Sequence, residues 1–437
     1  MLLRSFLLAL AGAITAAASL AANQGSPTFY KDVLPILQQH CQECHRPGEA
    51  APMPLLTYKQ TRPWIEEIRG AVASRRMPPW FADPQFGTFA NDRRLSQVEI
   101  GTIVHWIDAG APAGDPRQAP KPRHWVAGWS IGKPDTVFEM PAAFQIPASG
   151  TLAYRYVIVP THFKRDRWVR MAEVRPEDRE HTHHIVVSVR KPGSPWFRDR
   201  PIGIPFTLKP GDDDQAQGPF LAGYGPGDVP EILPPGDGKL IPAGSDLVFQ
   251  LHCTTDGKPG REQSRIGLVF LHRAPKHRVL MLAAANTHIL IPPYDPDYRA
   301  EARLVLHHAA TLISLLPHMH MRGKSFEFQV VYPDGRRQTL LIVPHYSYRW
   351  QLTYYLKKPL HLPAGSAIEC IAQYDNSPSN PHNPDAARYV GFGPQMWDEM
   401  MIGFFQVAVA PEVNMRELLL PLQQTHSQRL ANHTIDQ

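Results

Sequence analysis

The 437-residue sequence has few cysteines and almost no surplus of charge of either sign. It contains four cysteines, and its 45 basic and 40 acidic residues leave a net charge of only +5. No run of lysine and arginine forms a basic stripe, so a nucleic-acid or membrane-surface partner is not indicated. Beyond the first 22 residues, no stretch is long and apolar enough to span a bilayer. We therefore expect no nucleic-acid partner and no membrane span in the mature chain.

The N-terminus has the pattern of a secretory signal. Arg4 forms a short positive region, residues 6–14 are apolar, and Ser19-Leu20-Ala21 has the small-x-small pattern of a cleavage site. We predict a signal peptide at residues 1–22 and a periplasmic or secreted bacterial protein.

Proline, by contrast, is abundant, at 45 of 437 residues, roughly twice the average usage. Its even spread disfavours long helices and favours short strands with many turns. Leu247, Phe249 and Leu251 alternate with their neighbours in the pattern of a strand. The length allows two or three domains, and we predict a mainly β chain.

A five-residue motif, Cys41-Gln42-Glu43-Cys44-His45, follows the signal. Two cysteines at i and i+3 followed by histidine form the attachment signature of c-type haem. The cysteines bond to the porphyrin and the imidazole is an axial iron ligand. Export agrees with this, because covalent haem attachment takes place outside the bacterial inner membrane. We predict one haem c on Cys41, Cys44 and His45.

Three helices are predicted around this motif, at residues 29–39, 63–76 and 96–110, and the last begins with a capping box. We expect a small all-α cytochrome domain at residues 26–112, followed by a linker at 113–127. A thioether is a common second axial ligand; Met77 is the best candidate and Met53 the alternative. The stretch resembles small bacterial c-type cytochrome domains that end in a Trp-Ile-x-x-Gly-Ala helix, here residues 106–111.

A repeated phrase indicates two further domains. Ile-Pro-Ala-Gly-Ser-Asp-Leu at 241–247 and Leu-Pro-Ala-Gly-Ser-Ala-Ile at 362–368 each precede a strand, 121 residues apart. This spacing is about one β-sandwich. We predict tandem sandwiches at residues 128–285 and 286–437.

Histidines of the metal-binding kind are divided between these halves. In the second half, His318 and His320 lie at i and i+2, so on a strand both would reach one ion. Met400 and Met396 are equally plausible thioether ligands, and a thioether would favour copper. Further methionines are Met319, Met321 and Met401.

In the first half, the run His181-Thr182-His183-His184 allows two arrangements. Strand alternation pairs His181 with His183, whereas a strand end or bulge would turn His183 and His184 toward one ion. With His252 as a third ligand, either arrangement would give an all-nitrogen site.

From about Trp129 to Val409 the chain resembles the copper type II, ascorbate-dependent monooxygenases, the family of peptidylglycine α-hydroxylating monooxygenase and dopamine β-monooxygenase. The motifs that carry the resemblance are residues 183–186, 250–252, 317–323 and 398–401. The resemblance implies two linked jelly-roll-like β-sandwiches with one copper ion each.

It also implies the ligands. The electron-donating copper would be bound by His183, His184 and His252. The catalytic copper, which meets oxygen and substrate, would be bound by His318, His320 and Met400.

Two features depart from the family pattern. The family has a cysteine after the ligand methionine, bridged to an earlier strand, but Met401 stands there, so Cys370 lacks that partner. Cys253 directly after His252 is also unusual, and whether Cys253 and Cys370 are bridged stays open. Arg322 could contact an anionic substrate, but an ion pair with a nearby carboxylate is the favoured interpretation.

The implied reaction is C–H hydroxylation, in which one atom of O₂ enters the substrate and the other leaves as water. Two electrons are needed, one stored on each copper, and the fused haem could deliver them from a periplasmic donor or an ascorbate-like reductant. The substrate would be a small or peptide-like organic molecule, and no appended lyase is expected. The alternative is a non-catalytic periplasmic haem–copper electron carrier or copper-binding protein.

Overall fold

The computed structural model describes residues 25–49, 51–125, 128–208 and 218–419. The chain divides into a helical unit, residues up to 78 together with 93–124, and a β unit, residues 79–92 together with those from 125 onward. Strands predominate, as the sequence predicts. The predicted signal peptide lies outside the described residues. Within the described part, no helix has the length and apolarity needed to cross a membrane.

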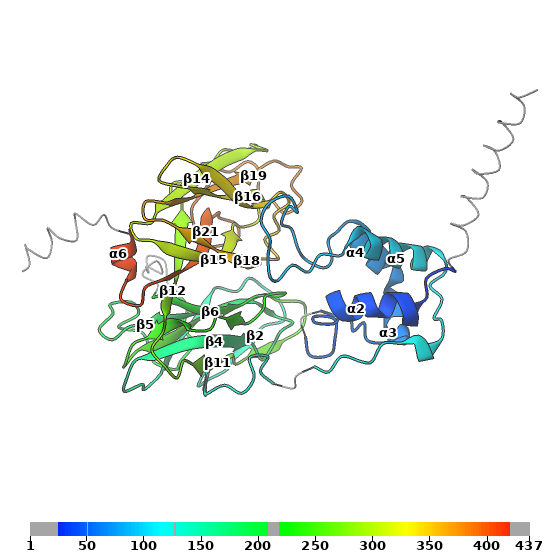
Figure 1. Ribbon diagram of the computed structural model, residues 1–437, viewed down its shortest axis with the longest axis horizontal. Coiled ribbons are helices and arrows are strands. Elements are labelled where there is room, and N and C mark those ends of the chain that lie inside the picture. The colour runs from blue at the N-terminus through cyan, green and yellow to red at the C-terminus, as the bar shows by residue number, and fades with distance from the viewer. Residues whose placement is uncertain (1–24, 50, 126–127, 209–217, 420–437) are drawn as a thin grey trace, which may run out of the picture. The chain divides into compact units, whose positions relative to one another are not determined.

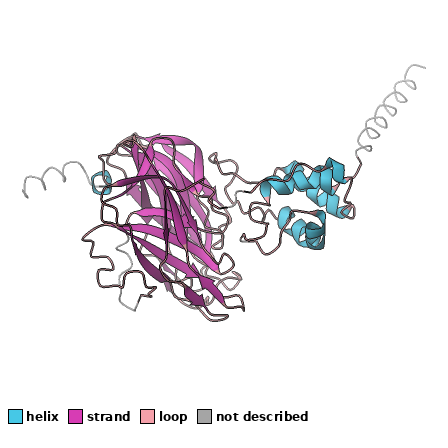
Figure 2. Ribbon diagram, turned by 90° about the horizontal axis from the view of Figure 1, so that it is seen from below, coloured by secondary structure: helices cyan, strands magenta, loops and turns pink. Residues whose placement is uncertain are grey.

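The helical unit contains short helices and no strands among its described residues (Figure 2). Its elements are η1 (Phe29–Val33), α2 (Leu34–His40), α3 (Tyr58–Thr61), η2 (Arg62–Trp64), α4 (Ile65–Ala73), α5 (Gln97–Asp108) and η3 (Pro116–Gln118). The predicted capping box is present at the start of α5: Ser96 Oγ accepts from the Glu99 N–H, and Glu99 accepts from the Ser96 N–H. The buried side of α5 presents Trp106, which is fully buried in the helical core.

Residues 79–92, which we define as the strap, belong to the β unit although they interrupt the helical sequence. Trp80 and Phe89 are buried in the core of the β unit, and the Trp80 ring centroid lies 4.8 Å from that of Tyr354. The Ala90 N–H donates to the Tyr355 carbonyl at 2.8 Å. The predicted helical domain at 26–112 is therefore wrong in this segment, because two aromatic side chains of the strap fill space between β-strands.

The strands of the β unit follow the chain in two sets (Figure 1). The first set is β1 (Thr136–Glu139), β2 (Phe144–Ile146), β3 (Arg155–Pro160), β4 (Arg167–Arg175), β5 (Thr182–Arg190), β6 (Phe220–Tyr224), β7 (Glu231–Ile232), β8 (Asp237–Ile241), β9 (Asp246–Cys253), β10 (Gly260–Glu262) and β11 (Arg265–Phe270). The second set is β12 (His277–Ala285), β13 (Leu290–Ile291), β14 (Tyr298–Val305), β15 (Ala310–His318), β16 (Gly323–Val331), β17 (Arg337–Val343), β18 (Tyr354–Leu362), β19 (Ala367–Tyr374), β20 (Val390–Gly391) and β21 (Ile402–Val409), followed by α6 (Met415–Leu419).

One large sheet runs through both sets in the order β1-β11-β4-β8-β12-β21-β15-β18, with β7 paired to β4. A four-stranded sheet, β3-β9-β5-β6, faces the first part of it, and their apolar side chains form one buried core. A second four-stranded sheet, β14-β19-β16-β17, shares a second core with β12, β21, β15 and β18. Two sandwiches therefore share one continuous sheet.

The repeated phrase makes the same turn in both sandwiches. It connects β8 to β9 and β18 to β19, and its glycines, Gly244 and Gly365, both have positive φ. The two four-stranded sheets also have the same order when β3, β9, β5 and β6 are matched with β14, β19, β16 and β17. The halves thus share one topology, as a duplication would produce.

The boundary between the halves differs from the predicted 285/286. Strand β12 pairs with β21 from Arg278↔Val409 to Ala285↔Ile402, so it is part of the second half. Its pairing with β8 is limited to two residues, His277 and Arg278. The boundary lies in the connection at 271–276, because hydrogen bonding along a whole strand outweighs two parallel pairs.

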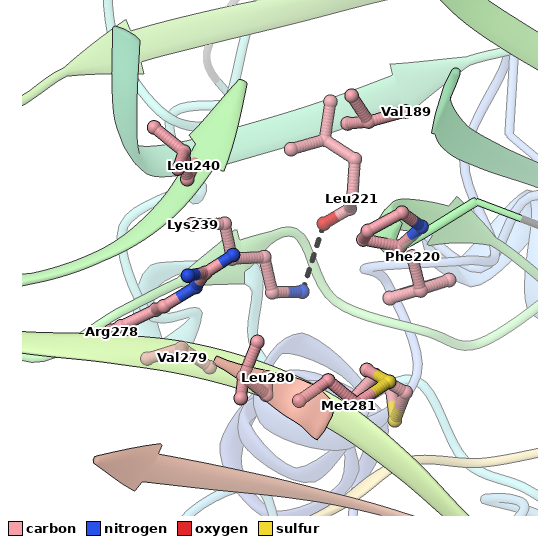
Figure 3. A pocket seen from close by; sticks show the side chains of 11 residues that line it. Val189, Phe220, Leu221, Lys239, Leu240, Arg278, Val279, Leu280 and Met281 are labelled. Atoms are coloured by element: carbon pink, nitrogen blue, oxygen red, sulfur yellow. Dashed lines mark hydrogen bonds between the residues drawn. The ribbon is translucent and has the colours of Figure 1, made fainter. Parts of the chain in front are cut away.

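Buried polar side chains join the halves next to a small cavity (Figure 3). Lys239 Nζ donates to the Leu221 carbonyl at 2.8 Å and lies 3.3 Å from a carboxylate oxygen of Glu231. Glu231 in turn accepts from the amide of Gln406 on β21 at 2.9 Å. The cavity is lined by residues such as Phe220, Lys239 and Met281, and by none of the histidines considered below.

Candidate metal centres

A β-bulge sets the geometry of the first histidine group. On strands β5 and β9, Thr182 lies opposite Cys253 and His184 lies opposite His252, so the register shifts by one residue at His183. The extra residue breaks the alternation that would otherwise send His183 and His184 to opposite faces. The neighbouring pair predicted as one alternative from the sequence is the pair that the structure brings together.

His183, His184 and His252 form one cluster, in which one potential ligand atom from each residue lies within 4.8 Å of the others. The Nδ1 atoms of His183 and His184 are 3.1 Å apart. The Nδ1 atom of His252 is buried and has no hydrogen-bond partner. The Tyr154 ring packs against the cluster, with its centroid 4.8 Å from that of His252. Such a group of three imidazoles can hold a metal ion.

Burial keeps these imidazoles neutral. Burial, and then the nearby His183, lower the pKa of His252 to about 4. Burial also lowers the pKa of His183. The pKa of His184 falls well below its ordinary value through burial and the neighbouring imidazoles. A metal ligand must be unprotonated, so the cluster is suited to bind metal over a wide range of pH.

His181 is not part of the cluster. Its Nδ1 lies 2.7 Å from Asp178 Oδ2 and its Nε2 lies 2.9 Å from Asp256 Oδ1, so carboxylates occupy both ring nitrogens. Burial alone would lower the pKa of His181, but the hydrogen bonds to Asp178 and Asp256 raise it overall. The question left open by the sequence is settled by these contacts: His181 holds the loop before the bulge.

The second histidine group lies at the end of β15. The rings of His318 and His320 have centroids 5.3 Å apart. Nδ1 of His318 lies 2.6 Å from Gln351 Oε1, and Nδ1 of His320 lies 3.2 Å from the Asp398 carbonyl oxygen. Because both acceptors require a protonated Nδ1, each ring keeps its Nε2 lone pair for a metal ion.

The chain segment that carries Met400 runs beside this pair. β15 and β21 pair up to His318↔Ile402, so His320 follows the last paired residue of β15 by two residues and Met400 precedes the first paired residue of β21 by two. Met401, in contrast, is fully buried in the core. The Met400 carbonyl accepts from the Tyr374 hydroxyl at 2.8 Å. Met400 is half-buried and lies in the segment whose neighbouring residues, Asp398 and Glu399, contact His320.

Arg322 does not form the ion pair that the sequence suggested. It is 2 % exposed, and its guanidinium donates to Asn376 Oδ1 at 2.8 Å, to the Trp397 carbonyl at 2.9 Å and to the Asp385 carbonyl at 3.4 Å. Its three acceptors are an amide and two backbone carbonyls, and its burial keeps the guanidinium from a substrate anion. Arg322 instead fixes the loops around the second histidine group.

The two histidine groups interact electrostatically. Burial, and then His318, lower the pKa of His320 to about 3, and His252 of the other group contributes further. His183 likewise contributes to the lowered pKa of His318, after burial. Each histidine group therefore contributes to a lowered histidine pKa in the other, or has its own lowered by it.

In the helical unit, the Cys-x-x-Cys-His motif forms a tight turn at the end of α2. The N–H groups of Cys44 and His45 both donate to the Cys41 carbonyl, at 3.2 and 2.9 Å. Nδ1 of His45 lies 3.1 Å from the Met53 carbonyl oxygen, which leaves Nε2 available. Both cysteine residues are half-buried. This turn presents two thiols and one imidazole nitrogen together.

The two methionines proposed as haem ligands differ in position. The Met53 carbonyl lies behind the His45 ring, on its Nδ1 side, and the Met53 side chain packs against the helical core. Met77 follows α4, is half-buried, and its N–H donates to the Ala71 carbonyl at 3.2 Å.

None of the four cysteines is bridged. Cys253 is on β9 and Cys370 on β19, in different halves, and both are buried. The sulfur of Cys370 packs so closely on Gly403 of β21 that a Cβ there would lie 2.3 Å from it. A bridge between Cys253 and Cys370 is therefore absent from the structure.

Several contacting residues were not predicted from the sequence. Gln351 is 33 residues from His318 in a loop, and Tyr154 lies before β3. Neither stands in a recognisable motif, so no local signal marks them. Asp398 does stand in the motif that includes Met400, and its role is carried by a backbone carbonyl.

No family model matches the sequence, and no curated protein matches it. The solved structures that match include the STIV MCP crystal structure, with 9% identity over 63% of this chain and 95% of that chain, and a TM-score of 0.25. A structure of the infectious bursal disease virus Gx strain matches with 8% identity over 65% and 74%, and a TM-score of 0.19. The structure of PNGF-II matches with 9% identity over 67% and 64%, and a TM-score of 0.20. TM-scores this low establish neither a shared fold nor a shared function.

Proposed function

We propose that this chain is an exported copper- and haem-dependent monooxygenase, which hydroxylates a C–H bond of an organic substrate with O₂. The observation that carries the proposal is the pair of imidazole groups in one β unit: three histidines in the first half and two in the second. Met400 lies in the segment that contacts His320 and would add a thioether to the second group. The two sandwiches would be the jelly-roll-like domains of the copper monooxygenase family, and the helical unit its added cytochrome domain.

The first group fits a copper ion. A buried nitrogen without a partner, here Nδ1 of His252, costs about 1–3 kcal/mol, and a bound ion would remove that cost. The 3.1 Å between Nδ1 of His183 and Nδ1 of His184 suits two lone pairs directed at one cation. Three neutral imidazoles suit a copper ion, although they do not select copper over zinc.

The second group fits copper more specifically. Two imidazoles with a thioether from Met400 form a softer ligand set, which favours copper, especially Cu(I). Copper bound in these two sites would supply one-electron redox chemistry and activate O₂. The protein contributes the rest: Gln351 and Asp398 orient the imidazoles of His318 and His320, and burial keeps them unprotonated.

The helical unit fits a covalent haem. Cys41 and Cys44 would form the two thioether bonds and His45 Nε2 would bind the iron, with its Nδ1 held by the Met53 carbonyl. Haem would supply electrons singly. Because the Met53 carbonyl is engaged by Nδ1 of His45, Met77 would be the better candidate for a second iron ligand.

The test compares wild type with His318→Ala, and with His361→Ala, an exposed histidine on β18, as the matched control. Oxygen consumption by the reduced protein is measured with and without a panel of organic molecules, beside the haem absorption spectrum. We expect His318→Ala to abolish substrate-stimulated oxygen consumption and to leave haem reduction unchanged. A wild-type protein whose metals reduce but which consumes no oxygen with any substrate would be the non-catalytic electron carrier instead.

A further inference from the structure

Each half of the β unit contains a fully buried glutamate close to its histidine group. Glu262 and Glu399 are both 0% exposed. Among the described residues, neither carboxylate forms an ion pair with lysine or arginine. Each instead accepts hydrogen bonds from two backbone N–H groups. A buried carboxyl group is costly to keep unless its partners compensate for the lost water. For Glu399 these partners include the nearby charge of Arg322 as well as the backbone N–H groups. The shared arrangement of the two glutamates indicates a role.

Glu399 joins the two chain segments that form the second histidine group. Its Oε2 accepts from the His320 N–H at 2.8 Å, and its Oε1 accepts from the Arg322 N–H at 2.6 Å. Glu399 directly precedes Met400 and follows Asp398, whose carbonyl holds the His320 ring at 3.2 Å. Glu399 thus fixes the backbone of His320, and Asp398 fixes its ring. The next residue, Met400, would supply the thioether.

Glu262 has the corresponding position in the first half. Its carboxylate accepts from the N–H groups of Glu177 and Asp178, at 3.3 and 2.8 Å. It also accepts from the Thr182 hydroxyl at 3.1 Å and from the Ser264 hydroxyl. Thr182 is the last residue before the bulge that turns His183 and His184 together. Glu262 therefore anchors the segment that leads into the ligands.

We propose that Glu262 and Glu399 are positioning residues, each of which fixes the backbone that presents one histidine group, so that the ligand nitrogens converge before copper binds. The proposal rests on the proposed two-copper function. Both carboxyl groups are directed at backbone N–H donors, so we assign them to the backbone and not to the metal. Residues that orient metal ligands in this way are worth about 10–100-fold in metal affinity.

The test is a crossed pair of variants, Glu262→Gln and Glu399→Gln, in the full-length haem-containing protein. Glutamine keeps the shape of the side chain, but its amide nitrogen faces a backbone N–H and cannot accept from it. Copper affinity is measured by titration against a competing chelator. X-ray absorption of the Cu(I) form distinguishes the sites, since only the second has a sulfur ligand. Glu301→Gln, at an exposed position, is the control.

We expect Glu399→Gln to weaken the second site about 10–100-fold and to lose the sulfur signal, with the first site changed less than about twofold. We expect Glu262→Gln to weaken the first site about 10–100-fold, to change the second site less than about twofold and to keep the sulfur signal. Two coppers bound with unchanged affinity in both variants would overturn the proposal, and so would equal losses at both sites, which would show support of the fold only. A wild-type protein that binds no copper would instead overturn the proposed function.

Discussion

His184 and His252 lie directly opposite each other on β5 and β9, and their ring centroids are 5.1 Å apart. The bulge at His183 adds a third imidazole on the same side. Strand pairing therefore fixes two ligand positions, and one inserted residue supplies the other. The candidate site of the first half is therefore built by backbone register.

Removal of one cross-strand partner should empty this site alone. We expect His252→Ala to lower the copper content from two ions to one per chain, because two imidazoles remain and one face of the ion is left open. The second site should keep its copper, since its ligands come from β15 and the segment before β21. Elemental analysis after dialysis measures the ratio, with His361→Ala as control. Loss of both coppers would contradict independent sites.

Copper binding at the first site should resist acid. Protonation competes with copper for the ring nitrogen, and an ordinary histidine pKa near 6.5 would weaken binding from about pH 7 downward. The pKa of His252 is lowered to about 4, so affinity should stay level to about pH 5 and fall below that. Chelator competition across this range measures it.

Nuclear magnetic resonance of the copper-free protein gives an internal contrast to that titration. His181, whose pKa is raised by Asp178 and Asp256, should titrate above the ordinary histidine value. His252 should titrate far below it. A fall in copper affinity that begins near neutral pH would show that the cluster is more exposed to water than the structure has it.

The contact between Gln351 and His318 should be worth a measurable share of the second site's affinity. Gln351→Leu removes the acceptor at 2.6 Å from Nδ1, which frees the ring to rotate and to change tautomer. We expect copper at the second site to bind about 10–100-fold more weakly, with the first site unchanged. Gln338→Leu, at an exposed position on β17, should have no such effect. Equal behaviour of the two variants would exclude this role.

The strap should stabilise the β unit although it interrupts the helical sequence. Trp80 is 5% exposed and packs between Phe89 and Tyr354. Trp80→Ala should destabilise the β unit by about 3–5 kcal/mol, the usual cost of emptying such a site. Trp64→Ala, at a position 39% exposed in the helical unit, should change the free energy of unfolding by less than about 0.5 kcal/mol. Denaturant unfolding followed by circular dichroism distinguishes them; similar small losses would mean that the strap is dispensable.

The parts that the sequence predicts are those with local signals. The capping box at Ser96, the turns at Gly244 and Gly365, and the mainly β composition each depend on a few neighbouring residues. The grouping of His318 with His320 follows from spacing alone. Strand alternation could not choose between His181 and His184, because a bulge is decided by pairing with a distant strand.

The parts that the sequence does not predict depend on long-range contacts. The strap belongs to the β unit because Trp80 packs against Tyr354, which is 274 residues later in the chain. Strand β12 joins the second half because its partner is β21. The side chains of Gln351 and Glu399 contact His318 and His320 only because the fold brings distant chain segments together. No local sequence pattern predicts such long-range contacts.

The most direct measurement is the metal stoichiometry of the full-length protein, matured in a periplasm and reloaded with copper. Copper and haem iron are determined per chain on the same sample. The account predicts two coppers and one haem, with sulfur coordinated to one of the two coppers. One haem with no copper would contradict it, because both histidine groups would then have another purpose.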